Sequence, residues 1–286
     1  MKKIVFTLLL LILLTGCDFK NNTFNNSTTY TTLYAIKYAT EYMYSDYSKV
    51  NSIYLNGINV NEYEPTEKNI ENYSKADIFI YSGLNDESSI ARDLLNKNEK
   101  IKIIDATKDI KNISSIDEAW INPANYLIMC GTIKKTLIEY TDSVYDIKKI
   151  EEKYQELHTA VSELDAELNL LVKKANYNNI LVADDLFNYL TKYNLNVISI
   201  DPNTEYLDKN ITTAKKLIEN GDIKYIYIVK DKELSEETNN LISSLNVTKL
   251  EINTFKNITN EEYKNKETYI SLMKKINEEY KKELYK

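Results

Sequence analysis

Few residues in this sequence have the types and spacing that catalysis requires. The chain has 5 glycines, and it contains neither a glycine-rich phosphate loop nor a Gly-x-Ser-x-Gly nucleophile motif. Its one histidine, His158, lies in a long helical pattern that offers no nucleophile partner. The Asp184-Asp185 dipeptide and Glu118 could act as an acid–base pair, but paired acids are common on solvated faces. The sequence therefore predicts a protein that is not an enzyme.

The two cysteines differ in their surroundings. Cys17 follows Leu14-Thr15-Gly16 at the end of an apolar run that begins after two lysines. This run is shorter than the roughly 20 residues that span a bilayer, and small residues before a cysteine indicate a cleaved signal peptide. The segment resembles a bacterial lipobox. That resemblance implies removal of residues 1–16, diacylation of Cys17, and an extracytoplasmic protein held on the cell membrane by lipid alone.

Composition excludes several other classes of protein. The formal net charge is −7 without a basic stripe, which argues against nucleic-acid partners. Once Cys17 carries lipid, Cys130 stands alone, so an internal disulfide and a cysteine-based zinc site are excluded. Residues 17–29 are rich in Asn, Thr and Ser, and we interpret them as a flexible tether between the lipid and the folded body.

A long helix is predicted in the middle of the chain. Apolar residues recur every three or four positions from Tyr140 to Ala175, and neither Gly nor Pro interrupts them. The spacing also suits a coiled-coil seam with a second chain. Because α/β patterns flank the helix on both sides, we interpret residues 140–176 as a helix that connects two halves of a monomer.

Strands alternate with helices on both sides of this helix, which indicates parallel sheets covered by helices. The fold class is therefore α/β, with an N-terminal lobe at residues 30–139 and a C-terminal lobe at residues 177–286. Ligands of such sheets bind outside the carboxyl ends of the strands, so a cleft between the lobes is expected. The predicted strands are 50–55, 78–81, 101–104, 179–183, 196–200, 224–229 and 247–252. The predicted helices besides the long one are 67–73, 88–97, 125–139, 187–192, 212–220, 236–245 and 266–284.

An ordered set of short segments resembles the metal-binding lipoproteins of zinc and manganese ABC transporters. The segments are Thr31-Thr32-Leu33-Tyr34-Ala35-Ile36, Glu64-Pro65-Thr66, Ala76-Asp77-Ile78-Phe79-Ile80-Tyr81-Ser82-Gly83, Trp120-Ile121-Asn122-Pro123, Phe187-Asn188-Tyr189-Leu190 and Tyr269-Ile270-Ser271-Leu272-Met273. The resemblance implies two α/β lobes joined by a rigid helix. It also implies that a divalent metal ion is captured between the lobes and delivered to an ABC transporter permease.

The resemblance also marks the positions of the metal ligands. Family members use three histidines and one carboxylate, and this sequence has lost all three histidines. Their positions fall on Asn61, Glu118 and Asp184, and the fourth ligand is expected near Glu251. Trp120 and Phe187 are expected to pack behind the motif loops.

An all-oxygen ligand set has a definite chemical preference. Carboxylate and amide oxygens suit hard ions such as manganese better than zinc, and crowded carboxylates repel one another without a cation. Loss of the histidines also permits two other interpretations. One is a metal-free, adhesin-like or repurposed surface lipoprotein that keeps the fold, and the other is a cleft for a different class of ligand.

Overall fold

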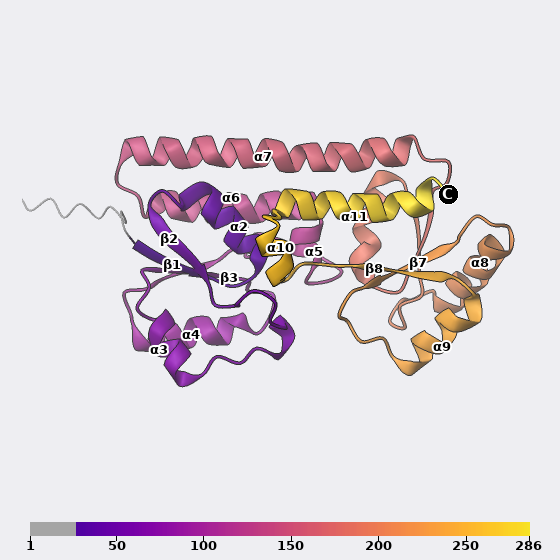
Figure 1. The fold of residues 1–286 in the computed structure, drawn as a ribbon, viewed down its shortest axis with the longest axis horizontal. Helices are drawn as coiled ribbons and strands as arrows, with labels where there is room; N and C mark the ends of the chain where they lie inside the picture. Colours follow the sequence, from indigo (N-terminus) through magenta and orange to yellow (C-terminus); the bar gives the residue numbers. More distant parts are fainter. Residues whose placement is uncertain (1–26) are drawn as a thin grey trace, which may run out of the picture.

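The computed structural model describes residues 27–286 and shows two α/β lobes side by side (Figure 1). Each lobe contains a four-stranded parallel sheet, and both sheets have the same strand order, β2-β1-β3-β4 and β6-β5-β7-β8. The predicted fold class is confirmed. The strands of the first sheet are β1 (Ser27–Thr31), β2 (Ser48–Ser52), β3 (Ile78–Tyr81) and β4 (Lys102–Asp105). Those of the second are β5 (Asn179–Val182), β6 (Asn196–Ser199), β7 (Tyr225–Val229) and β8 (Thr248–Ile252).

Helices cover both faces of each sheet. In the first lobe, α3 and α4 lie on one side of the sheet and α2 and α6 on the other (Figure 1). In the second lobe, α9 lies below the sheet and α8 at its outer end (Figure 1). Covered parallel strands need apolar side chains on both faces, and Ile78, Phe79 and Ile80 of β3 are all buried. The helices are α2 (Tyr34–Tyr44), α3 (Glu67–Tyr73), α4 (Glu87–Lys97), α5 (Glu118–Ile121), α6 (Pro123–Glu139), α7 (Val144–Lys173), α8 (Leu207–Glu219), α9 (Glu236–Leu245), α10 (Asn260–Lys264) and α11 (Tyr269–Leu284). Two 3-10 helices, Val60–Glu62 and Asp185–Tyr193, complete the set.

The long helix α7 runs across both lobes (Figure 1), but it begins later than predicted. A turn at residues 140–143 separates α7 from α6, and the Ser143 hydroxyl accepts a hydrogen bond from the Asp146 N–H (3.3 Å) as the N-cap of α7. The side chain of a capping serine favours a helix start over continuation. The prediction of helix from Tyr140 was therefore wrong in its first turn.

Two further predictions differ from the structure near the N-terminus. Strand β1 begins at Ser27, so the last three residues of the predicted tether belong to the sheet; the rest of the tether, Cys17 and the signal peptide lie outside the described residues. Helix α2 was not predicted, although seven of its eleven residues are buried.

One hydrophobic core continues from lobe to lobe beneath α7. It includes Ile36 and Phe79 of the first lobe, Leu157 and Leu164 of α7, and Phe187 of the second lobe. A separate cluster lies between the second sheet and helices α8 and α9. Because interiors are close-packed, the shared core opposes a large hinge movement between the lobes.

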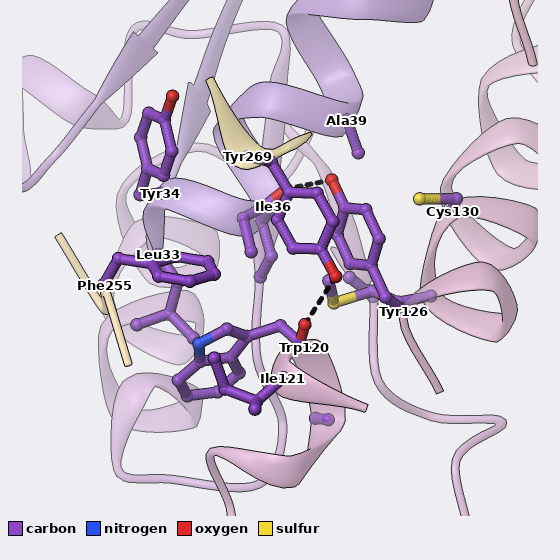
Figure 2. Packing of buried hydrophobic residues seen from close by; sticks show 14 of the residues in the cluster. Leu33, Tyr34, Ile36, Ala39, Trp120, Ile121, Tyr126, Cys130, Phe255 and Tyr269 are labelled. Carbon is purple, nitrogen blue, oxygen red and sulfur yellow. Dashed lines mark hydrogen bonds between the residues drawn. The ribbon is translucent and has the colours of Figure 1, made fainter. Parts of the chain in front are cut away.

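Aromatic side chains fill the junction between the lobes (Figure 2). The Tyr126 and Tyr269 rings stack with centroids 3.8 Å apart, and the Tyr269 hydroxyl donates to the Trp120 carbonyl (2.7 Å). The Trp120 indole N–H in turn donates to the Thr254 carbonyl beyond β8 (2.7 Å). Trp120 and Phe187 are buried, as expected.

We predict that Tyr269→Phe destabilises the protein by about 1–3 kcal/mol, because it leaves the buried Trp120 carbonyl without its donor. Urea denaturation followed by circular dichroism measures the change. The control is Tyr263→Phe, which also removes a phenol hydroxyl, but from a side chain that is 60% exposed. This substitution should change stability little. Equal effects from the two substitutions would show that the buried hydrogen bond contributes nothing.

A carboxylate is buried in the first lobe, and no lysine or arginine of residues 27–286 forms an ion pair with it. Glu87, in the first turn of α4, is 3% exposed; it accepts hydrogen bonds from the Tyr54 hydroxyl (2.8 Å) and the Ser82 N–H (2.9 Å). Burial raises the pKa of Glu87 above its ordinary value of 4.5, and these hydrogen bonds oppose the rise only in part.

This raised pKa predicts a pH dependence of stability. The folded state binds the Glu87 proton more tightly than the unfolded state does, so stability falls as the pH rises from the ordinary pKa through the raised one. Glu87→Gln cannot ionise and should lose this part of the pH dependence. The free energy of unfolding, measured at several pH values from 4 upward, tests the prediction. The matched control is Glu64→Gln at an exposed position. If both variants follow the wild-type pH profile, burial of Glu87 has no such effect.

Candidate functional site

A cleft of about 590 Å³ lies where loops of the two lobes meet. The first lobe contributes two loop segments, and the second lobe contributes the segments that follow three of its strands. The lining residues are Gly57 to Asn61, Ser115 to Asp117, Asp184, Val229 to Lys232, Asn253, Thr254 and Lys256 to Thr259. A cleft at the carboxyl ends of parallel strands is where this class of sheet binds ligands, as the sequence predicted.

The topology of the second sheet explains which residues reach the cleft. Strands β5, β7 and β8 are adjacent and parallel, so the residues after them emerge at the same edge. Asp184 follows β5, Lys232 follows β7, and Lys256 follows β8. The fold therefore brings Asp184, Lys232 and Lys256, which are far apart in the chain, to the same edge of the second sheet.

Asp184 has a fixed orientation. It is 3% exposed, and one carboxylate oxygen accepts a hydrogen bond from the Leu186 N–H (2.7 Å), which caps the 3-10 helix that follows. The other oxygen forms an ion pair with the Lys232 ammonium. Burial acts to lower the pKa of Lys232, but the contact with Asp184 outweighs it, and the Lys232 pKa is raised.

A second ion pair joins the two lobes. The Lys256 ammonium lies 3.2 Å from an Asp117 carboxylate oxygen, and it donates to the Asn61 side-chain carbonyl (3.3 Å). Asp117 is 6% exposed. Burial raises the pKa of Asp117, and the charge of Lys256 opposes that rise.

The structure does not bring the four sequence-predicted site residues together. Asn61 and Asp184 line the cleft. The Glu118 carboxylate is buried outside the cleft lining, where it accepts hydrogen bonds from the Ser114 N–H (2.9 Å) and the Asn122 and Asn125 amides (both 3.3 Å). Glu251 is an exposed residue inside β8. The cleft lining instead includes Asp117 and Lys256, neither of which was predicted. The family motif had indicated Glu118, the neighbour of Asp117.

The donor atoms do not form a preassembled metal site. Within residues 27–286, no three His, Cys, Asp or Glu side chains lie close enough to hold a metal ion. His158 is half-buried in α7, near Ser162, and does not line the cleft. As arranged, each buried cleft carboxylate is neutralised by a lysine, Asp184 by Lys232 and Asp117 by Lys256.

Comparisons with known proteins give matches for both the N-terminal segment and the folded body of the chain. Residues 29–283 match the family described as the periplasmic zinc-uptake complex component A. The chain belongs to this family. Residues 1–17 match the prokaryotic membrane lipoprotein lipid attachment site. Membership of the zinc-uptake family confirms the predicted resemblance, and the attachment site confirms a lipid-anchored, extracytoplasmic location. The prediction that the chain is not an enzyme also agrees with a family of transport components.

The zinc-binding lipoprotein AdcA of Streptococcus pneumoniae serotype 4 is 25% identical over 304 residues, which cover 96% of this chain and 60% of AdcA. This chain thus spans only 60% of that relative's length. The zinc-bound ZnuA-like domain of S. pneumoniae AdcA superposes with a TM-score of 0.70 at 22% identity, covering 92% of this chain and all of that domain. The metal-dependent lipoprotein YcdH of Bacillus subtilis gives 0.72 at 21%, covering 91% and 99% of the two chains. These two structures confirm the fold.

In the part of the chain that the structure describes, none of the helices is both long enough and apolar enough to cross a bilayer.

We predict an asymmetric response to breaking the ion pair between Asp117 and Lys256. Lys256→Gln leaves a buried carboxylate without its cation and should be the more destabilising change. Asp117→Asn leaves an ammonium whose side chain is 32% exposed, so water replaces the lost partner. Because of this exposure, we expect a coupling free energy of only about 1 kcal/mol.

A double-mutant cycle by urea denaturation at pH 7 measures this coupling. Lys230→Gln is the matched control: it removes an equal charge from the lining of the same cleft. Strictly additive effects of the two substitutions would mean that the pair contributes no stability.

Proposed function

We propose that this chain is the solute-binding component of a metal-ion ABC transporter. It captures a divalent metal ion in the cleft between its lobes and delivers it to a permease in the membrane to which it is anchored. We propose further that it acts as a monomer. The observation that best supports this function is the placement of the cleft in the zinc-uptake family fold, with two buried aspartates, Asp117 and Asp184, in its lining.

The chemistry of the cleft favours a hard cation as cargo. Asn61, Asp117 and Asp184 offer only oxygen atoms, and hard ions such as manganese accept such ligands more readily than zinc does. Because these are fewer donors than such an ion takes, water would complete its coordination shell. Glu118 and Glu251, the other residues proposed from the sequence, could contribute only after a rearrangement of their loops.

A second function is a metal-free surface lipoprotein that retains the fold, for example one that adheres to other cells or matrix. The two ion pairs favour it, because the two buried carboxylates of the cleft already have cationic partners. The same experiment distinguishes the two functions.

We predict that divalent ions raise the unfolding temperature of the chelator-treated, detergent-solubilised lipoprotein, with manganese more effective than zinc. A ligand that binds only the folded state stabilises it by roughly 2.7 kcal/mol at a hundredfold excess over its dissociation constant. Asp184→Asn should abolish the shift, because it removes a buried charged ligand.

The control is Asp231→Asn, which removes the same charge from the lining of the same cleft. Asp231 has a φ of 59°, and asparagine tolerates that left-handed conformation, so the backbone should not change. An equal loss in both variants would mean that only the overall charge matters. No shift with any ion in the wild type would favour the metal-free function.

A further inference from the structure

The three metal donors proposed for the cleft, Asn61, Asp117 and Asp184, are each in contact with an ammonium group. Lys232 pairs with the carboxylate of Asp184, while Lys256 contacts both the Asp117 carboxylate and the Asn61 amide oxygen. Each oxygen donor in this set therefore already has a positively charged neighbour.

A divalent ion and an ammonium group cannot both contact the same carboxylate oxygen without strong repulsion. Two like charges a few ångströms apart near a protein surface repel each other strongly. The Asp184 and Asp117 side chains are only 4% and 8% exposed, so water screens this repulsion poorly. A metal ion therefore has to displace both lysines before it can use both carboxylates.

The lysines are able to leave. A lysine carries its charge on a flexible four-carbon stem, and the Lys232 and Lys256 side chains are 56% and 32% exposed. Each can turn into solvent while its backbone stays in place. The aspartates cannot move in the same way, because they are buried and the Leu186 N–H holds Asp184.

We propose that Lys232 and Lys256 are internal cations that compete with the metal ion for the cleft, and that they set its metal affinity. The inference rests on the proposed metal-binding function and identifies residues that determine affinity. Each lysine is attached beside its carboxylate, so it competes at a high effective concentration and returns as soon as the ion leaves. The cleft therefore binds metal weakly and releases it readily.

Isothermal titration calorimetry with manganese and zinc on the chelator-treated, detergent-solubilised full chain tests this proposal. The variants are Lys232→Gln, Lys256→Gln and the double substitution. We expect each single variant to lower the dissociation constant by about tenfold and the double variant by about a hundredfold; each tenfold step corresponds to about 1.4 kcal/mol.

Two sets of controls separate competition from other effects. Lys230→Gln removes a positive charge from the same cleft, and Lys230 forms no ion pair in the part of the chain that the structure describes; we expect a change of less than about threefold, since charge at the rim is screened. Lys232→Arg and Lys256→Arg retain the cation and should keep the low affinity of the wild type. Thermal unfolding confirms that each variant is folded, and if Lys256→Gln is not, Lys232→Gln alone carries the test.

The outcomes are distinct. Tight binding in the wild type that the glutamine variants do not improve would overturn the competition while leaving the metal-binding function standing. Equal gains in affinity for Lys230→Gln would overturn it as well, because the effect would then be one of net charge. Binding that appears only in the double variant would support it. A complete absence of binding in folded wild-type and double-variant protein would refute the metal-binding function itself.

Discussion

The structure depends on one segment, residues 253–258, that leaves the second sheet and is hydrogen-bonded to the first lobe. The Lys256 carbonyl accepts from the Tyr34 N–H (2.9 Å), and the Ile258 carbonyl accepts from the Gly57 N–H (2.8 Å). Gly57 has a φ of 83°, a conformation that glycine adopts without strain. Within this segment the buried Phe255 has a φ of 38° and packs edge-on against Tyr269. Such a conformation persists in a bulky residue only where the surroundings enforce it.

This segment fixes the geometry of the cleft as well as that of the lobes. Its backbone is joined to the first lobe, so the Lys256 side chain begins close to Asp117 and Asn61. Lys232 has no such constraint and reaches Asp184 from the loop after β7. The result is one ion pair between the lobes and one within the second lobe. The two lysine side chains can therefore leave the carboxylates without separating the shared core.

The sequence predicted most of the fold because apolar periodicity reports burial directly. Strands 78–81 and 196–200 lie within one residue of the observed limits. The break before α7 was missed because the apolar pattern continues across it, and only the capping role of Ser143 marks it. Helix α2 was overlooked although Ile36, Ala39 and Met43 have helical spacing.

The candidate site was harder to predict because motif alignment locates a loop but not the direction of its side chains. Glu118 and Asp117 are neighbours, yet the hydrogen bonds to Ser114, Asn122 and Asn125 hold Glu118 outside the cleft lining while Asp117 lines the cleft. Nothing in the sequence marked Lys232 and Lys256 as cleft residues, since lysine is usually a solvated surface residue and 36 basic residues are spread along the chain. Only the adjacency of β5, β7 and β8 shows that Lys232 and Lys256 meet the buried acids.

The rigidity of this fold makes side-chain competition an effective way to control release of a bound ion. Binding proteins with a free hinge can release their ligand by separating the lobes. Here α7 and the continuous core beneath it oppose that movement, so the free energy for release has to come from within the cleft. Two lysines that replace the ion at the carboxylates supply it locally, because the departing charge is exchanged for another and the buried acids are never left unpaired.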